Sequence, residues 1–146
     1  MRTALIVGVL CVAALLVGGT LWRQHQLEDY RAEISAVLAR RVELRSQFLS
    51  PGRRPMLKGY VEGLKAVDTS ECPPRFKLAW LGYVHAWERR TDGTEAIYGV
   101  ASFAEGFTEG DFKPLLHEMD KLNTNEAWYV CQQIAALYGV ATNETN

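Results

Sequence analysis

An uninterrupted apolar stretch near the N-terminus constrains this chain more than any other feature of its sequence. From Thr3 to Trp22 it reads TALIVGVLCVAALLVGGTLW, without a charge or a proline. A helix of about 20 apolar residues, each rising about 1.5 Å, spans the ~30 Å hydrocarbon layer of a membrane. The stretch ends at Trp22 and Arg23, and an amphipathic ring and a long cation both suit a membrane interface. We therefore expect residues 1–22 to be a membrane anchor, with lipid contacts through residues 3–22.

A cleaved signal peptide is the alternative interpretation of the same stretch. Arg2 supplies the positive charge with which such peptides begin, but their apolar cores extend over only about 7–15 residues. Cleavage also requires a small-x-small sequence, for which Val17-Gly18-Gly19 and Gly18-Gly19-Thr20 are poor substitutes. The sequence therefore favours an anchor that is retained.

The side of the membrane on which the rest of the chain lies is indicated by two opposing features. Basic residues follow the apolar stretch at Arg23, Arg31, Arg40 and Arg41, and the positive-inside rule would then place the domain in the cytoplasm. A short basic head before an apolar run, here Arg2, is instead how exported chains begin. We expect a single-pass protein whose domain lies on the periplasmic, extracytoplasmic side.

The cysteines bear on the same question. Cys11 lies in the apolar stretch, which leaves Cys72 and Cys131 as a pair that could form a disulfide in an oxidising compartment. Such a bridge would close a loop of about 60 residues and stabilise the fold by a few kcal/mol. The alternative is two free buried thiols, which behave as small hydrophobic side chains.

Charge is unevenly distributed along the chain, although the net charge is only −1. Residues 23–58 hold eight basic and four acidic side chains, whereas residues 92–146 hold two basic and nine acidic ones. A basic region beside a membrane suits anionic head groups, and an acidic outer face suits a basic protein partner. Ordinary solvated surface is the alternative. The basic residues are neither dense nor interleaved with aromatics, so we expect no nucleic-acid partner.

The anchor is expected to continue into a stalk helix over residues 23–50, because neither Gly nor Pro occurs between Thr20 and Ser50. Apolar residues recur along it at spacings of three and four, with Arg41 in the one gap: Leu27, Tyr30, Ile34, Val37, Leu44 and Phe48. This spacing is typical of a helix that faces another helix. It favours packing of the stalk on its own domain, with a homodimer formed through the stalk as the alternative.

Residues 51–140 are expected to form a small helical domain of about four or five helices, after the anchor and the stalk helix. One short helix begins near Pro55, and an aromatic helix begins at Pro73 and Pro74, which suit a first helical turn. Thr69 or Ser70 could cap this second helix. Its apolar face follows helical spacing and predicts core residues at Phe76, Ala79, Trp80, Tyr83, Val84 and Trp87.

The rest of the domain is also helical in pattern. Residues 95–107 predict a weak helix interrupted by glycines, and a second helix follows Asp111. A last helix is capped by Asn123 or Thr124 and ends at Gly139, before a polar tail over residues 141–146 that we expect to be frayed. Strand patterns are nearly absent, so the predicted fold class is all-α.

The residues that could carry chemistry do not form a recognised pattern. His85 and Glu88 lie one helical turn apart, but di-iron bundles require a Glu-x-x-His pair on each of two helices. His117 begins like the zinc-binding helix of a protease, but Lys121 stands where the second His is required. His85, His117 or Met119 could ligate a haem iron, although such residues are far more often surface or core positions. We therefore predict no catalytic residue, no metal site and no cofactor.

Three functions are compatible with this sequence. The favoured one is a membrane-anchored, non-catalytic accessory or interaction subunit of a larger membrane-associated assembly, with protein partners. The first alternative is an envelope protein that binds a small ligand, such as haem or an apolar molecule, between residues 74–90 and 93–111. The second alternative is an enzyme whose site is assembled from residues distant in the sequence.

Overall fold

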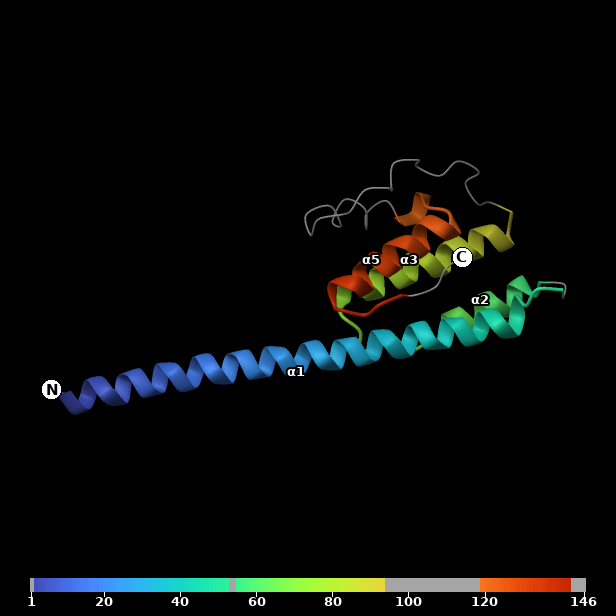
Figure 1. Cartoon of the computed structure of the whole chain (residues 1–146). Coiled ribbons are helices and arrows are strands. Elements are labelled where there is room, and N and C mark those ends of the chain that lie inside the picture. The colour runs from blue at the N-terminus through green and yellow to red at the C-terminus, as the bar shows by residue number, and fades with distance from the viewer. Residues whose placement is uncertain (1, 53–54, 94–118, 143–146) are drawn as a thin grey trace.

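The computed structural model describes residues 2–52, 55–93 and 119–142, and of residues 2–21 it describes the backbone alone. These residues form four α-helices and one short 3-10 helix, without a strand among them, which confirms the predicted all-α class. The elements are α1 (Arg2–Phe48), α2 (Leu57–Lys65), α3 (Pro74–Thr91), η2 (Met119–Lys121) and α5 (Thr124–Leu137). Figure 1 shows α2, α3 and α5 gathered along the C-terminal half of α1, while its N-terminal half extends beyond them.

The first helix is continuous because no helix-breaking residue interrupts its second half. It comprises 47 residues, which corresponds to a length of roughly 70 Å. Ser50-Pro51-Gly52 follows its end, and Gly52 adopts a positive φ of 83° that a residue with a side chain rarely takes. Among the described residues, no helix is both long enough and apolar enough to cross a membrane. The anchor over residues 1–22 stays a prediction from the sequence.

The C-terminal half of α1 belongs to the core of the helical domain. Tyr30 meets Tyr138 edge-to-face, with ring centroids 5.9 Å apart, and Phe48 packs half-buried against the core. Leu27 is 48% exposed. Three further positions of the apolar spacing are buried among side chains of the other helices: Ile34, Val37 and Leu44. The spacing in residues 23–50 therefore serves packing on the chain's own domain, the interpretation that we favoured.

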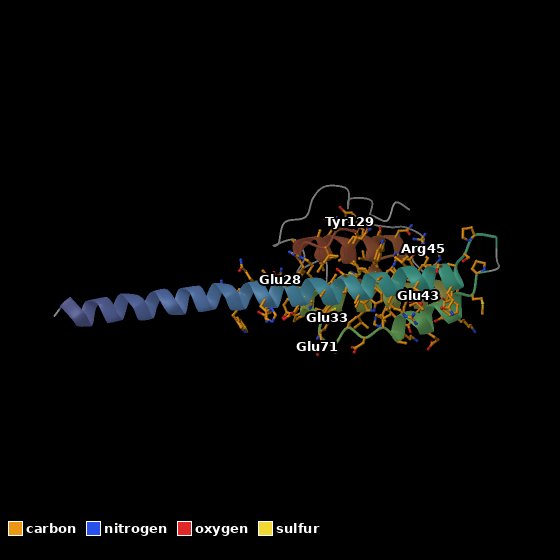
Figure 2. The ribbon with its side chains drawn as sticks, turned by 60° about the horizontal axis from the view of Figure 1, so that its bottom comes forward. Glu28, Glu33, Glu43, Arg45, Glu71 and Tyr129 are labelled. Atoms are coloured by element: carbon orange, nitrogen blue, oxygen red, sulfur yellow. The ribbon has the colours of Figure 1, made fainter. Side chains whose placement is uncertain are left out.

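The outer side of α1 is charged where it runs along the bundle. Figure 2 shows Glu28, Glu33 and Glu43 along this stretch, and all three are exposed. Arg40 pairs with Glu43 at 2.5 Å. Exposed pairs within one helix contribute only about 0.3–0.5 kcal/mol each. The buried face, and not the charged one, therefore holds α1 to the domain.

Two residues without side chains let α2 lie close to α1. A Cβ atom on Gly59 would stand 2.7 Å from the ring of Phe48, and one on Gly63 would stand 2.6 Å from a methyl group of Leu44. Carbon atoms that are not bonded prefer a separation of about 3.5–4.0 Å. Residues four apart share one face of a helix. The side chains of α1 therefore occupy the space that larger residues on α2 would need.

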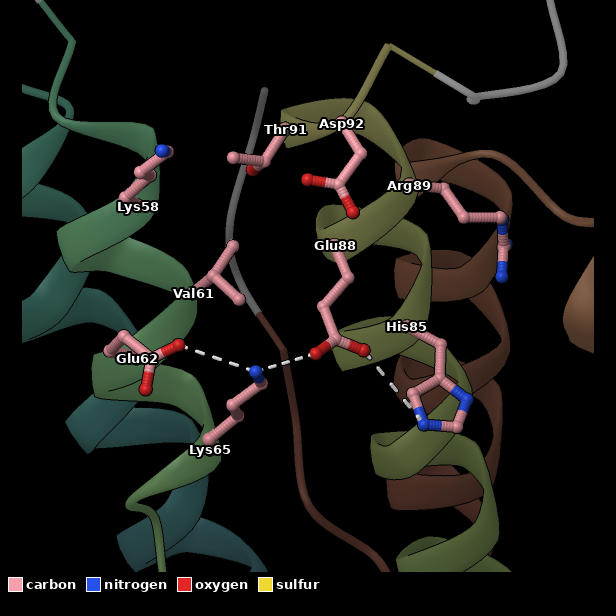
Figure 3. Close-up of a pocket in the computed structure, with 9 residues that line it drawn as sticks. All are labelled: Lys58, Val61, Glu62, Lys65, His85, Glu88, Arg89, Thr91 and Asp92. Atoms are coloured by element: carbon pink, nitrogen blue, oxygen red, sulfur yellow. Dashed lines mark hydrogen bonds and ion pairs between the residues drawn. The ribbon is translucent and has the colours of Figure 1, made fainter.

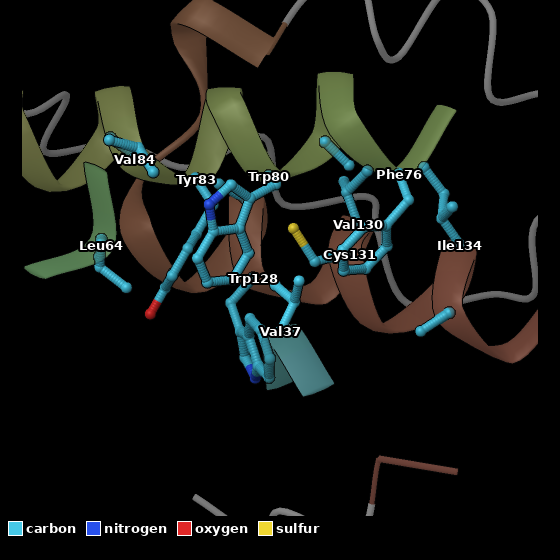
Figure 4. Close-up of a cluster of buried hydrophobic side chains, with 14 of the residues drawn as sticks. Val37, Leu64, Phe76, Trp80, Tyr83, Val84, Trp128, Val130, Cys131 and Ile134 are labelled. Carbon is cyan, nitrogen blue, oxygen red and sulfur yellow. The ribbon is translucent and has the colours of Figure 1, made fainter. Parts of the chain in front are cut away.

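The aromatic face of α3 forms much of the core, as its spacing predicts (Figure 4). The Tyr83 ring lies between two tryptophans, with centroids 5.7 Å from Trp80 and 5.3 Å from Trp128. Five of the six predicted positions are buried: Phe76, Ala79, Trp80, Tyr83 and Val84. Trp87, the sixth, is partly buried against the same cluster. Burial of such large rings accounts for the close packing of α3 against α5.

The start of α3 differs in one respect from expectation. Pro73 occupies the cap position and Pro74 begins the helix, but no side chain caps it. The prediction of a Thr69 or Ser70 cap is therefore wrong, because these residues lie too far upstream. Ser70 instead donates its backbone N–H to the Asp68 carboxylate at 2.8 Å, and this bond lowers the pKa of Asp68.

The last helix begins and ends as predicted. The Asn123 side chain accepts hydrogen bonds from the backbone N–H groups of Asn125 and Glu126, each at 3.0 Å. The Glu126 carboxylate accepts the backbone N–H of Asn123 at 3.1 Å, which completes a capping box. Gly139 ends the helix with a φ of 74°.

Two predicted helices lie mainly outside the described residues. The weak helix over residues 95–107 does so entirely. Of the helix that follows Asp111, the structure describes the C-terminal end alone, where Met119–Lys121 is a 3-10 helix. Met119 and Leu122 are both buried, as the predicted apolar face requires.

Candidate functional site

A groove of about 770 Å³ lies between α2 and α3 and contains His85 and Glu88, the pair that the sequence singles out (Figure 3). We call it the α2–α3 groove. Its lining includes three basic side chains and three acidic ones: Lys58, Lys65, Arg89, Glu62, Glu88 and Asp92. The groove is therefore close to electrically neutral.

Lys65 joins the two walls of the groove. Its ammonium group lies 2.6 Å from the Glu88 carboxylate on α3 and 3.3 Å from the Glu62 carboxylate on α2. The hydrogen bond to Glu88 and then the one to Glu62 raise the pKa of Lys65. The side chains of Lys65 and Glu88 are 43% and 32% exposed, so solvent screens their attraction. The ion pairs thus set the position of α2 against α3 more than they stabilise the fold.

His85 lies on the α3 wall beside Glu88. Its Nε2 atom is 4.0 Å from Glu88 Oε2, and its side chain is 43% exposed. A carboxylate that orients a catalytic histidine lies within about 2.6–3.2 Å of it. Glu88 is beyond that range and already binds Lys65. Among the described residues, no group of three or more His, Cys, Asp or Glu could hold a metal ion. The arrangement suits a polar clasp between two helices better than acid–base catalysis.

The three weak haem-ligand candidates are not brought together by the described part of the chain. Met119 is 4% exposed, and its side chain packs against Gly82, where a Cβ atom would stand 2.4 Å from the Met119 methyl group. His85 lies half-buried in the α2–α3 groove. His117 lies outside the described residues. Met119 therefore acts as a core residue that fills the space above a glycine.

Both cysteines of the predicted disulfide are free thiols in the structure, and both are buried. This corresponds to the alternative stated for them, two small hydrophobic side chains. Burial, and secondarily the charge of Glu33, raises the pKa of Cys72 to about 11. Burial also raises the pKa of Cys131, although the nearby Arg41 cation opposes the shift. Thiols with raised pKa values stay protonated at neutral pH and are poor nucleophiles.

The residues predicted for a membrane interface lie on the exposed part of α1. Trp22 is 66% exposed, and Arg23 is also exposed. Among the described residues, no part of the bundle covers most of this large apolar ring. Their placement beyond the bundle is compatible with the interfacial role that the sequence predicts.

A functional feature that the sequence analysis missed is the buried charge of Arg41. Arg41 is 3% exposed, and its Nε donates to the Tyr83 hydroxyl at 2.9 Å. That hydroxyl lies 3.1 Å from the hydroxyl of Tyr60, whose pKa is raised by burial first and then by Tyr83. The guanidinium carbon stands 3.4 Å from the centre of the Trp128 ring. The available signal was the position of Arg41 in the one gap of an apolar spacing.

No protein-family model matches the chain, and neither the curated proteins nor the solved structures provide a match. Function is therefore inferred from the residues and their arrangement.

Proposed function

We propose that this chain is a membrane-anchored, non-catalytic accessory subunit whose helical domain docks with protein partners of a membrane-associated assembly. The observation that carries the proposal is the continuity of α1. The helix that begins in the apolar stretch is the same helix that contributes Ile34, Val37 and Leu44 to the core. A domain built around its own tether is held close to the membrane without a flexible linker.

The α2–α3 groove supports a structural role for the polar residues of the domain. Lys65 is engaged by two carboxylates, and Glu88 by Lys65. Charged groups that neutralise one another fasten helices together, whereas catalysis requires groups preorganised toward a substrate. The buried, protonated thiols of Cys72 and Cys131 likewise suit packing.

An extracytoplasmic domain remains part of the proposal. It now depends on the basic residue that precedes the apolar stretch, because the free thiols give no separate argument for an oxidising compartment. The basic residues after the stretch argue for the opposite orientation. Protease protection of the domain in right-side-out membrane vesicles distinguishes the two.

The test of the anchor is fractionation of cells that express the full chain. We expect the intact chain in membranes washed with alkaline carbonate, and a Leu10→Arg/Leu15→Arg double variant in the soluble fraction, because each charge in a span costs about 2.5–3.5 kcal/mol. Leu10→Val/Leu15→Val is the matched control and should stay in the membrane. A soluble wild-type chain, or a mature mass that lacks the first twenty or so residues, would contradict the anchor.

The test of the accessory role is purification of the full chain from native membranes in mild detergent. We expect other chains to co-purify in fixed stoichiometry and to remain bound through a sizing column. A solitary chain, purified from membranes that had been solubilised under several mild conditions, would contradict a subunit role.

A further inference from the structure

A second cavity, of about 220 Å³, lies where α1, α3 and the N-terminus of α5 meet. We call it the arginine pocket, because Arg41 and Arg45 of α1 and Arg90 of α3 all line it. Trp87 and Trp128 form aromatic walls. The described residues that line the pocket include no acidic side chain. Among the described lining residues, every charged side chain is therefore basic, in contrast to the mixed charges of the α2–α3 groove.

Two of the arginines are held in position by the surrounding side chains. Arg41 donates from Nε to Tyr83 at 2.9 Å, and its guanidinium lies over the Trp128 ring. Arg90 donates from Nη1 to Thr124 Oγ1 at 3.0 Å, and its guanidinium carbon is 5.0 Å from the centre of the Trp87 ring. Planar cations stacked on aromatic rings lose little further entropy when they bind a ligand.

The N-terminus of α5 adds to the positive potential of the pocket. Thr124, the first residue of this helix of 14 residues, lines the cavity together with Asn125. A helix N-terminus carries the positive end of the helix dipole and attracts anions. The dipole acts in the same direction as the three arginines.

Trp87 is one aromatic wall of the pocket and also holds a buried donor. Its indole Nε1 has no hydrogen-bond partner among the described residues. The atom is closed to solvent, so Trp87 serves the site as a wall and as a reporter of changes in its surroundings.

The size of the pocket and its place along α1 restrict the ligand. One water molecule takes about 30 Å³ of liquid volume, so this cavity suits several waters or one small anion and is too small for a haem. Arg41 lies 19 residues beyond Trp22, or roughly 28 Å along the helix. Head groups beside Trp22 would lie far from the pocket, which favours a dissolved ligand.

We propose that the arginine pocket binds a small dissolved oxyanion of the phosphate or carboxylate type. Guanidinium groups bind both through paired hydrogen bonds, and Trp87 and Trp128 wall the space in which the anion would lie. The proposal goes beyond the accessory role and does not depend on a protein partner. Its choice of a dissolved ligand over a lipid head group rests on the proposed anchor at residues 3–22.

The test is a titration of the full chain in mild detergent, followed through the NMR signal of the Trp87 indole N–H. Trp87→Phe identifies this signal. Inorganic phosphate and acetate are the probes, with sodium chloride exchanged to keep ionic strength constant. We expect a saturable shift of the indole signal in the millimolar range with at least one probe. Absence of any shift, or the same shift with sodium chloride alone, would overturn the proposal.

Substitutions distinguish binding in the arginine pocket from nonspecific attraction of anions by the overall charge of the protein. Arg45→Gln removes an exposed arginine of the pocket and should weaken binding about tenfold. Arg90→Gln should do the same. Arg40→Gln, an exposed neighbour on α1 outside the pocket, is the matched control and should change affinity less than about twofold. Equal losses in Arg40→Gln and Arg45→Gln would overturn the pocket assignment.

An experiment in lipid nanodiscs distinguishes a dissolved anion from a lipid head group as the ligand. The chain is placed in nanodiscs of phosphatidylcholine and in nanodiscs of phosphatidylglycerol, without added phosphate or acetate. We expect the Trp87 signal to be the same in both. A shift that appears only with phosphatidylglycerol would overturn the dissolved ligand in favour of a lipid head group.

Discussion

The α2–α3 groove and the arginine pocket lie on the same small bundle but have opposite electrostatic designs. In the groove, three basic and three acidic side chains line the walls, and Lys65 bridges two of the carboxylates while solvent reaches these pairs. In the pocket, three arginines share a smaller space with aromatic rings. The α2–α3 groove is the larger cavity, but its charged groups already bind one another, so it offers less to a charged ligand than the arginine pocket does.

The difference indicates that cavity size is a poor guide to function in this protein. Exposed ion pairs contribute little because water competes with them. A buried arginine, by contrast, is held by specific hydrogen bonds, and its loss leaves other buried polar groups without partners. Arg41 should therefore matter far more than Lys65, and substitutions can test that ranking.

The largest expected effect is that of Arg41→Ala. The substitution removes the hydrogen bond to Tyr83 and the stacking on Trp128, and it leaves a cavity. We expect it to lower the free energy of unfolding by about 2–4 kcal/mol. Urea unfolding of the full chain in mild detergent, followed by circular dichroism, measures this.

Arg40→Ala is the control for Arg41→Ala, because Arg40 directly precedes Arg41 in the same helix and is exposed. It should change the free energy of unfolding by no more than about 0.5 kcal/mol. Similar losses in both variants would remove the distinction between buried and exposed arginines on which the comparison depends.

An intermediate effect is expected from Cys131, whose thiol is fully buried near the arginine pocket. Its pKa is raised in the folded state, so the unfolded chain loses the proton first as the pH rises. Stability is then complete below the ordinary thiol pKa and is lost above it, by about 1.4 kcal/mol per pH unit. Unfolding measured from pH 8 to pH 10 should show this loss.

Cys131→Ala should reduce the slope of the same pH profile without abolishing it, because the pKa of Cys72 is also raised in the folded state. The variant should also lower stability throughout. Alkylation tests the state of the sulfur atoms directly. Cys72 and Cys131 should both react after denaturation without a reducing agent. If they react only after reduction, the disulfide predicted from the sequence exists, and the assignment of Cys72 and Cys131 as free thiols is wrong.

The smallest effect is expected from Lys65→Gln in the α2–α3 groove. It breaks both ion pairs of Lys65, but these are exposed to solvent. The melting temperature should fall by no more than about 2 °C, and high salt should reduce the difference further. Lys58→Gln, in the same groove, is the control. A loss as large as that of Arg41→Ala would reverse the ranking of the two cavities.

The local features of the fold could be predicted from the sequence because they depend on neighbouring residues. Helical spacing identified the buried face of α3, and the Asn123 cap and Gly139 stop bounded α5. Proline at the start of α3 was also anticipated, although the side-chain cap upstream of it was not found.

The sites could not be predicted because their partners are distant along the chain. Arg41 contacts Tyr83 and Trp128 on two other helices, and Lys65 of α2 pairs with Glu88 of α3. One signal was visible in the sequence GYVEG, whose two glycines four residues apart permit the contact of α2 with α1. The disulfide was proposed from the number of cysteines and their positions along the chain, which carry no information on the distance between the two sulfur atoms.

The continuity of α1 has a rotational consequence. Because its second half is locked into the core, the domain cannot turn about the helix axis independently of residues 2–22. Each residue of an α-helix advances the chain by about 100° around the axis. One residue inserted between Trp22 and Leu27 would turn a different side of α3 and α5 toward any neighbour of the first twenty residues, and seven inserted residues would nearly restore the original side. The length of this segment therefore sets which side of the domain faces a neighbour, as well as how far the domain lies from the first twenty residues.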